Sequence, residues 1–417
     1  MSVRRTASLR RMRRTPRPPT HGQLVVLLGA LSTFGPLSMD MYLPGLPAMA
    51  HDLSAPAWAA QLTITTSMLG LAGGQLFAGP VSDTLGRRRP LLAGVAAYMA
   101  TSLLCALAPN VWILLVLRLA QGCAGAAGIV IARAVVRDLH EGVEAARFFA
   151  MLMLVTGLVP ILAPLAGGQL LHVTDWRGIF VVLAAIGAVL LLAAWWVLAE
   201  TLDERDRHGG GLVATLHVFA GLTRDRCFMG YVLSAGLTFA AMATYISGSP
   251  FVLQDIHGVS PQLFSLLFAV NAGGILVASQ VSRRLVGRYG PRRLLDAAVT
   301  QGAIGGAGVL VSVVAGLGLA GLLPCLFVMV SSIGMVLPNA AALALADHPR
   351  TAGSASALLG LAQFSIGAIA APIAGVAGSH TALPMGIVMA VLPAAGLVCL
   401  FGLAGSSRPR RARATVG

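Results

Sequence analysis

The chain has 417 residues, of which 57% are hydrophobic and only 11% are charged, and its 29 basic and 15 acidic residues give a net charge of +14. Roughly a quarter of the residues of a soluble domain are charged, so this composition excludes an ordinary water-soluble fold and predicts a membrane protein. All the basic residues are arginine. Without lysine there is no Gly-x-x-x-x-Gly-Lys-Ser/Thr phosphate loop, which excludes an ATP-driven pump.

Apolar stretches of about 20 residues, each long enough to cross a hydrocarbon layer of about 30 Å as a helix, recur along the chain. Twelve are predicted, so the expected fold class is an all-α integral membrane protein. In chain order the predicted spans cover residues 22–45, 59–80, 90–108, 111–134, 148–171, 178–199, 227–251, 261–281, 293–316, 320–345, 353–376 and 382–404.

The arginines gather on one side of these spans. If the basic N-terminal tail, residues 1–21, lies in the cytoplasm, every even-numbered loop and the basic C-terminal tail, residues 405–417, lie there too, and only Arg118 and Arg177 fall elsewhere. This is the positive-inside distribution of membrane proteins. The charge therefore indicates topology and contact with anionic lipid, and no nucleic-acid partner is expected. A signal peptide cleaved after Ala48-Met-Ala50 is rejected because eleven more spans follow.

Two charged residues are predicted within the membrane. Of fifteen acidic residues only Asp40 is expected inside a span, about one turn from its outer end, and Arg118 lies roughly two turns into the fourth span from the same side. A charge at the bilayer centre costs about 2.5–3.5 kcal/mol on insertion scales, so such residues indicate function. At matching depths the two can face one cavity as a buried pair. The alternative for Asp40 is a helix-end residue at the outer interface.

An internal repeat divides the chain near its middle. Ala163-Pro-Leu-Ala-Gly167 recurs as Ala371-Pro-Ile-Ala-Gly375, and the run from Gly86 to Leu92 has a counterpart, shifted by 204 positions, that starts at Gly290. Two six-helix bundles, residues 22–199 and 227–404, joined by a polar loop over residues 200–226, are predicted, which is a transporter architecture. Five scattered cysteines and nine histidines without ligand spacing predict no disulfide framework and no metal site. No cofactor and no enzymatic activity are expected.

Several motifs resemble those of a known family. The turn Gly79-Pro-Val-Ser-Asp-Thr-Leu-Gly-Arg-Arg-Arg-Pro-Leu-Leu92 resembles the loop between helices 2 and 3 of the major facilitator superfamily. Met39-Asp-Met-Tyr-Leu-Pro-Gly-Leu-Pro47 and Arg118-Leu-Ala-Gln-Gly122 are similar to motifs of its bicyclomycin and chloramphenicol resistance branch of drug:proton antiporters. Further matches follow in the same order, at Arg137-Asp138, Asp175-Trp-Arg-Gly-Ile-Phe180, Glu200-Thr-Leu202, Ser249-Pro-Phe-Val-Leu253 and Gly258-Val-Ser-Pro261.

The resemblance implies a monomer that exports small amphipathic drugs by exchange with protons across the bacterial inner membrane. Proton coupling is assigned to Asp40 and Arg118. The residues implied for gating are Gly79, Asp83, Gly86, Arg87 and Asp138. Those implied for substrate binding are Tyr42, Gln121, Asn271, Asn339, Gln363 and Phe364, and those implied for a helix bend are Pro164, Gly167 and Gly168. For each asparagine and glutamine, helix packing is the alternative.

Two departures from the family pattern limit these assignments. Ala163 and Val159 stand where the antiporter motif of helix 5 has glycines, and Ser32 stands where some multidrug relatives carry a second acid. A two-proton mechanism and a strong preference for cations are therefore not expected. The other functions left open are proton-coupled transport of a metabolite, such as a sugar, an amino acid or a dipeptide, and a membrane receptor that does not transport.

Overall fold

The computed structural model describes residues 21–140, 142–203, 205, 219–346, 348, 352–378 and 380–404. Within these ranges the chain is helical and contains no strand. The elements before residue 200 are α2 (His21–Leu31), α3 (Phe34–Asp40), the 3₁₀ helix η2 (Leu43–Gly45), α4 (Leu46–Asp52), α5 (Ala57–Leu85), α6 (Arg88–Ala106), α7 (Val111–Leu139), α8 (Gly142–Leu170) and α9 (Trp176–Val197). The later elements are α11 (Arg226–Pro250), the π-helix η4 (Phe251–Ile256), α12 (Pro261–Val314), α13 (Gly318–Ala346), α14 (Ala352–Ala370), the 3₁₀ helix η6 (Ala371–Gly375) and α15 (Leu383–Ala404).

In the described ranges nine helices are long and apolar enough to cross a membrane, or ten when the bent pair Gly22–Leu31 and Phe34–Asp52 forms one span. Two observations explain why nine or ten spans are found in these ranges where the sequence predicts twelve. α12 is two helices joined at Gly290, whose φ of 77° and ψ of 157° are not helical. α5 corresponds to the predicted span 59–80 and has 29 residues, but it contains polar side chains such as Gln61 and Gln75 and is not among the nine helices of the described ranges that are apolar enough to count as spans.

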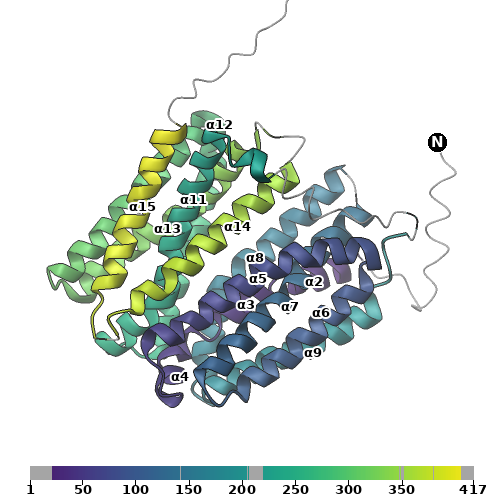
Figure 1. Cartoon of the computed structure of the whole chain (residues 1–417), viewed down its shortest axis with the longest axis horizontal. Helices are drawn as coiled ribbons and strands as arrows, with labels where there is room; N and C mark the ends of the chain where they lie inside the picture. Colours follow the sequence, from purple (N-terminus) through teal and green to yellow (C-terminus); the bar gives the residue numbers. More distant parts are fainter. Residues whose placement is uncertain are drawn as a thin grey trace, which may run out of the picture. The chain divides into compact units, whose positions relative to one another are not determined.

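The chain divides into two compact units. The first comprises Met1–Ala55 and Thr66–Gly211, and the second comprises Pro56–Thr65 and Leu212–Gly417. Figure 1 shows α2 to α9 in purple to blue-green and α11 to α15 in teal to yellow. The predicted bundles, residues 22–199 and 227–404, correspond to most of the two units, except that Pro56–Thr65 groups with the second. The predicted basic tails, apart from His21, and most of the predicted polar loop lie outside the described residues.

The first predicted span, residues 22–45, is not one helix as expected. Its two parts are bent by 48°, and α3 ends at Asp40. Pro36 and Pro44 explain both breaks, because a proline lacks the N–H group and its ring clashes with the carbonyl group four residues earlier. Those carbonyl groups belong to Ser32 and Asp40. Asp40, the acid predicted to lie within the membrane, is therefore at the end of a helix inside the membrane segment.

Side chains in the loops cap the N-termini of several helices. The side chain of Asn110 accepts a hydrogen bond from the backbone N–H of Ile113 at the start of α7. Asp175, Asp225 and Ser260 cap α9, α11 and α12 in the same way. Such caps satisfy N–H groups that have no partner within the helix. Two of the few acidic residues therefore have a structural task.

Glycines allow close contact between helices in the first unit. A Cβ atom at Gly70 of α5 would collide with the carbonyl oxygen of Leu119, and one at Gly122 of α7 would collide with that of Ser67. Small residues permit such backbone contacts in membrane proteins. As a result α7, which carries Arg118, lies directly against α5.

Each unit contains an arginine that binds the end of the unit's last helix. Arg88 donates hydrogen bonds to the carbonyl oxygens of Leu198, at 2.8 Å, and Trp195, at 2.9 Å. Arg292, 204 positions later, donates one to the carbonyl oxygen of Ala404 at 2.9 Å. A cation is favourable at a helix C-terminus. The two arginines, which the internal repeat relates, therefore perform the same task in the two units.

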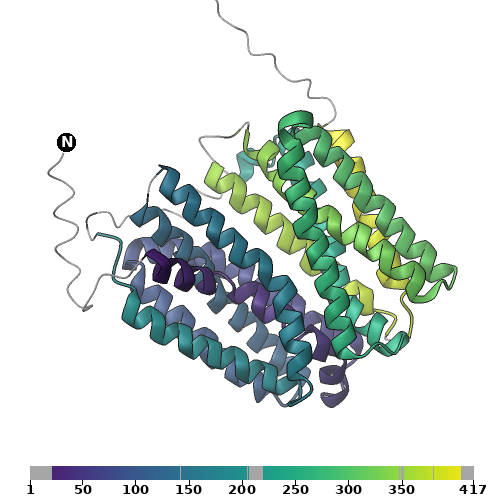
Figure 2. The ribbon, with the colours of Figure 1, turned by 180° about the vertical axis from the view of Figure 1, so that it is seen from behind.

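In the second unit α12 and α13 lie side by side, as both Figure 1 and Figure 2 show. The predicted span 353–376 ends there as the 3₁₀ helix Ala371–Gly375, whereas the matching run Ala163–Gly167 of the first unit belongs to the continuous helix α8. α12 also corrects one expectation, because Asp296 is a second acid within a predicted span. It lies near the start of the second helix of α12 and pairs with Arg292 at 2.9 Å.

Candidate functional site

Arg118 occupies a fully buried position in the first unit. Its Nη2 donates a hydrogen bond to the carbonyl oxygen of Ser38 at 3.0 Å, and its Nη1 donates one to Oε1 of Gln121. The guanidinium carbon lies 4.4 Å from the ring centre of Tyr42 and 5.5 Å from that of Phe180. A planar cation that carries only donors fits this mixture of oxygen atoms and ring faces. The structure thus brings Arg118, Gln121 and Tyr42 together.

Asp40 is the last residue of α3, two positions after Ser38, and 6% of its surface is exposed. Among the residues that the structure describes, its carboxylate has no hydrogen-bond or ion-pair partner. The buried pair with Arg118 that the sequence suggests is therefore not formed in this structure. The reason is a competing acceptor, because carbonyl groups in the last turn of a helix lack helical donors, and that of Ser38 receives the guanidinium. Among the residues that the structure places, Asp40 is thus a buried carboxyl group without a counter-ion.

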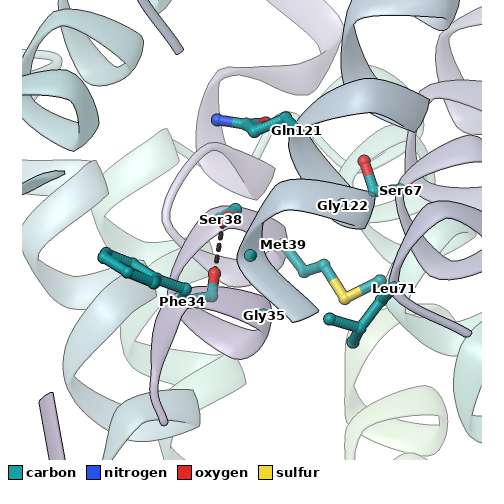
Figure 3. A pocket seen from close by; sticks show the side chains of 9 residues that line it. Phe34, Gly35, Ser38, Met39, Ser67, Leu71, Gln121 and Gly122 are labelled. Atoms are coloured by element: carbon teal, nitrogen blue, oxygen red, sulfur yellow. Dashed lines mark hydrogen bonds between the residues drawn. The ribbon is translucent and has the colours of Figure 1, made fainter. Parts of the chain in front are cut away.

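Polar residues around Arg118 complete the site. Tyr98 Oη lies 2.8 Å from Ser38 Oγ, and Gln121 Nε2 donates to Ser102 Oγ at 2.7 Å. The sequence reasoning above does not identify Ser38, Tyr98 or Ser102. The one available signal is that Tyr98 and Ser102 are polar residues four positions apart, and therefore on one face of an apolar helix. Ser38 and Gln121 line a cavity of about 10 Å³, which has space for at most about one water molecule; Figure 3 shows the side chains that line it.

The predicted gating residues of the first unit meet at Arg87. Its Nε donates to Asp138 at 2.9 Å, and its Nη1 donates to Ser82 at 2.8 Å and to Asp83. Burial lowers the pKa of Arg87, but the hydrogen bonds to Asp138 and Asp83 outweigh it, so the pKa is raised above its ordinary value. In the structure Asp83 and Asp138 both pair with Arg87, so the three residues form one cluster. Their gating function stays a prediction.

Glu200 belongs to the same cluster, although the sequence gives it only as part of a motif. Its Oε1 accepts a hydrogen bond from the backbone N–H of Arg87 at 2.7 Å, and its Oε2 accepts one from that of Arg88 at 3.2 Å. A carboxylate is favourable at a helix N-terminus, here that of α6. Gly86 has a φ of 86° and a Cβ atom there would collide with the Glu200 carboxylate, so glycine is required. Nothing in the structure requires glycine at Gly79.

We expect the ion pairs of Arg87 with Asp138 and with Asp83 to contribute differently to stability. The side chain of Asp138 is 15% exposed and that of Asp83 is 48% exposed. Breaking a buried pair costs about 3–5 kcal/mol and breaking a surface pair at most about 1 kcal/mol. Because Asp138 is 15% exposed, its pair falls between these limits, so Asp138→Asn should lower the free energy of unfolding by about 2 kcal/mol and Asp83→Asn by less than about 1 kcal/mol. Unfolding of the purified protein measures both losses, and equal losses would contradict this ranking.

A transport assay tests the gating function of Asp83 separately. If Asp83→Asn folds and also exports at the wild-type rate, Asp83 has no gating function.

Two further predicted substrate residues are buried in the second unit. Asn271 Nδ2 donates to Tyr245 Oη at 2.8 Å, and Asn339 Nδ2 donates to Ser282 Oγ at 2.7 Å. Both bonds join separate helices, which is the packing alternative to substrate binding. Contact with substrate stays a prediction for both.

The remaining predicted residues lie on α14 and α8. Gln363 and Phe364 are half-buried on α14, and the ring centre of Phe364 lies 5.5 Å from that of Phe239. Pro164, Gly167 and Gly168 lie within the continuous helix α8, and a Cβ atom at Gly167 would collide with the carbonyl oxygen of Met41. Gly167 therefore allows α8 to approach the chain next to Asp40. The bend itself stays a prediction.

Comparison with known proteins places these features in context. The profile of the Major Facilitator Superfamily matches residues 28–372. An uncharacterized MFS-type transporter of Bacillus subtilis, YdgK, is 42% identical over 91% of this chain and 95% of its own. A bicyclomycin resistance protein homolog of Haemophilus influenzae is 29% identical over 87% of this chain and 91% of its own. The xylose transporter XylE from E. coli has the same fold, with a TM-score of 0.72 at 13% identity over 91% of this chain and 97% of that chain.

Proposed function

This chain belongs to the Major Facilitator Superfamily, and from that premise we propose that it exports small amphipathic drugs in exchange for protons, by alternating access. The observation that carries the proposal is Asp40, a carboxyl group that is buried in a membrane segment and has no partner among the described residues. Burial disfavours the charged form of a carboxyl group, so such a group can take up and release a proton during transport. The similarity to a bicyclomycin resistance protein homolog supports a drug as substrate.

The cycle that we propose uses two charged groups of the first unit, Asp40 and Arg118. The inward-facing carrier loads substrate while Asp40 is ionised. Protonation of Asp40 from outside then weakens substrate binding and releases the compound. Arg118, held by the Ser38 carbonyl oxygen and the Gln121 amide, keeps its charge throughout, because a guanidinium is not deprotonated in proteins. In this cycle Arg118 supplies a fixed positive charge in the same unit as the titrating carboxyl group.

One titrating acid is energetically sufficient for this exchange. With a driving force of about 150 mV, one proton supplies about 3.5 kcal/mol. Because about 1.4 kcal/mol corresponds to a tenfold ratio, this could sustain a gradient of two to three decades for a neutral substrate. Ser32 at the position of the second acid of some relatives is consistent with coupling to a single proton.

The setting that goes with this function is also a proposal. We place the protein in the bacterial inner membrane, as a monomer, with both termini in the cytoplasm. The distribution of arginines supports this orientation, since positive residues are retained on the cytoplasmic side.

An export assay tests the proposed function directly. The full chain is expressed in a host that lacks its own drug pumps, and everted vesicles are given bicyclomycin, chloramphenicol, a dipeptide or a sugar, each radiolabelled. We expect accumulation of at least one of the two antibiotics that depends on an imposed proton gradient. Accumulation of only the dipeptide or the sugar would instead indicate a metabolite transporter. Absence of gradient-dependent accumulation for all four compounds would contradict the proposal.

A further inference from the structure

The side chain of Glu200 binds two segments of the first unit that are far apart in the chain. Its Oε1 accepts hydrogen bonds from the backbone N–H groups of Arg87 at 2.7 Å and of Thr201 and Leu202, both at 3.2 Å. Its Oε2 accepts one from the N–H group of Arg88 at 3.2 Å. Two of these donors stand at the start of α6, and the other two follow the end of α9. One carboxylate therefore holds both segments.

Thr201 connects the second of these segments to the end of α7. Its Oγ1 lies 2.9 Å from Oδ2 of Asp138, and the same carboxylate oxygen accepts a hydrogen bond from Nε of Arg87 at 2.9 Å. An ionised carboxylate only accepts, so the Thr201 hydroxyl group is the donor. Thr201 therefore fixes the Asp138 carboxylate at the atom that binds Arg87.

The side chain of Arg88 adds a third connection. It donates to the carbonyl oxygens of Leu198 and Trp195, and its guanidinium carbon lies 5.1 Å from the centre of the Trp195 ring. Beyond Leu202 the chain continues through the connecting loop into the second unit. The start of this loop is therefore anchored on the first unit at three places, by Glu200, by Thr201 and by Arg88.

The second unit offers a comparison. Arg292, the counterpart of Arg88, also binds the end of its unit's last helix, at Ala404. The residues after α15, 405–417, contain neither aspartate nor glutamate, so no acid there can take the place of Glu200. An arginine thus binds the last helix in both units. An acid follows that helix only in the unit whose chain continues into the connecting loop.

We infer that Glu200 and Thr201 are positioning residues that make the start of the connecting loop part of the Arg87 cluster. Asp83, Arg87 and Asp138 form this cluster. Glu200 acts through the backbone of Arg87, and Thr201 acts through the Asp138 carboxylate. Loop and cluster then form and separate together. This inference rests on the alternating access of the proposed function and on the gating function predicted for the cluster.

The alternative is that Glu200 only caps α6. A cap supplies acceptors for the free N–H groups at a helix start, and the carboxylate does this by itself. It does not need the bond between Thr201 and Asp138. The two interpretations therefore differ in what happens to the loop when the cluster is weakened. A cap is indifferent to Asp138, whereas positioning makes the loop depend on it.

Backbone hydrogen exchange of the full-length protein in lipid nanodiscs, without substrate, tests this dependence. Asp138→Asn weakens the cluster but leaves Glu200 and the N–H groups that it binds in place. We expect residues 200–203 to exchange at least about threefold faster in Asp138→Asn and in Thr201→Val, because a hydrogen bond that closes the segment is weakened or lost. Thr201→Ser keeps the hydroxyl group and should exchange as the wild type does. The N–H group of Ile113, which Asn110 binds at the other end of α7, should be unaffected in all three variants.

Glu200→Gln extends this experiment to both segments. The amide keeps an oxygen acceptor but loses the charge, so the N–H groups of Arg87, Arg88, Thr201 and Leu202 should all exchange faster. Unchanged exchange at 200–203 in Asp138→Asn and Thr201→Val would overturn the inference. So would a Glu200→Gln variant in which only one of the two segments exchanges faster.

An export assay tests the consequence for gating. Full-length protein in everted vesicles is given radiolabelled bicyclomycin and an imposed proton gradient. Thr201→Val keeps the shape of the side chain but lacks the hydroxyl group, and we expect its initial export rate to fall roughly two- to tenfold, the effect of one hydrogen bond on a cluster that must form in every cycle. Thr201→Ser should restore the rate.

The matched control is Thr84→Val. The Thr84 hydroxyl group bonds to the carbonyl oxygen of Val81 in its own helix at 3.0 Å, so its loss should leave the export rate unchanged. A wild-type rate in Thr201→Val, or an equal loss in Thr84→Val, would contradict the positioning.

The two measurements separate failure of this inference from failure of the proposed function. If the wild-type protein does not export bicyclomycin in response to the gradient, the proposed function fails, and hydrogen exchange alone decides whether loop and cluster act together. If the wild-type protein exports bicyclomycin and Thr201→Val does so equally fast, the positioning is wrong and the proposed function stands.

Discussion

Replacing Asp40 by asparagine is expected to abolish proton-driven export while the protein still folds and binds a neutral substrate. Asparagine has nearly the same size as aspartate but cannot release a proton. Asp40 has no partner among the described residues, so the change breaks no ion pair there. Export of bicyclomycin into everted vesicles with an imposed pH gradient should fall to the level of vesicles without the protein, and substrate addition should no longer release protons.

Two related variants sharpen this test. Asp40→Glu keeps a carboxyl group on a longer arm and should retain part of the activity. Asp296→Asn is the matched control, because Asp296 is also an acid within a membrane segment but pairs with Arg292, and it should leave the pH dependence of export unchanged. Undiminished gradient-driven export by Asp40→Asn would show that Asp40 does not couple protons. Asp52 and Asp255 would then be the next carboxyl groups to examine.

Replacing Arg118 is expected to have the second large effect. Arg118→Ala leaves the Ser38 carbonyl and Gln121 amide oxygens without their donor, and each unsatisfied buried group costs about 1–3 kcal/mol. Loss of the contact with the Tyr42 ring adds about 0.5–2 kcal/mol. Export should be lost and the melting temperature should fall. Arg118→Lys keeps the charge but cannot make the forked bonds and the flat stacking contact, so we expect export to fall at least about tenfold.

Arg177→Lys provides the comparison for this substitution. Arg177 also stacks on an aromatic ring, that of Trp176 at 4.3 Å, and it binds Asp52, but its side chain is 33% exposed. An exposed ion pair contributes little to stability, so Arg177→Lys should export at close to the wild-type rate. Wild-type export by Arg118→Ala would mean that the residue serves only to stabilise the fold.

The sequence alone was sufficient for the architecture and for the residues most in need of explanation. Apolar length and arginine distribution are properties of the chain itself, so the helical membrane fold and the internal repeat could be predicted. Arg88 and Arg292, related by the repeat, indeed bind the ends of α9 and α15. Asp40 and Arg118 could be selected because a charge in an apolar span is unfavourable wherever the span finally packs.

Only the tertiary structure decided which groups these charges meet. Helix periodicity places Arg118 and Gln121 on one face, but it does not show that the breaks around Pro36 and Pro44 end α3 where the Ser38 carbonyl oxygen can take the guanidinium. For the same reason the sequence gave little indication that Ser102, Tyr98 and Glu200 belong to these sites. Their partners are between 19 and 113 positions away in the chain. Hydrogen bonds over such separations depend on how the helices pack, whereas composition and periodicity report only local preference.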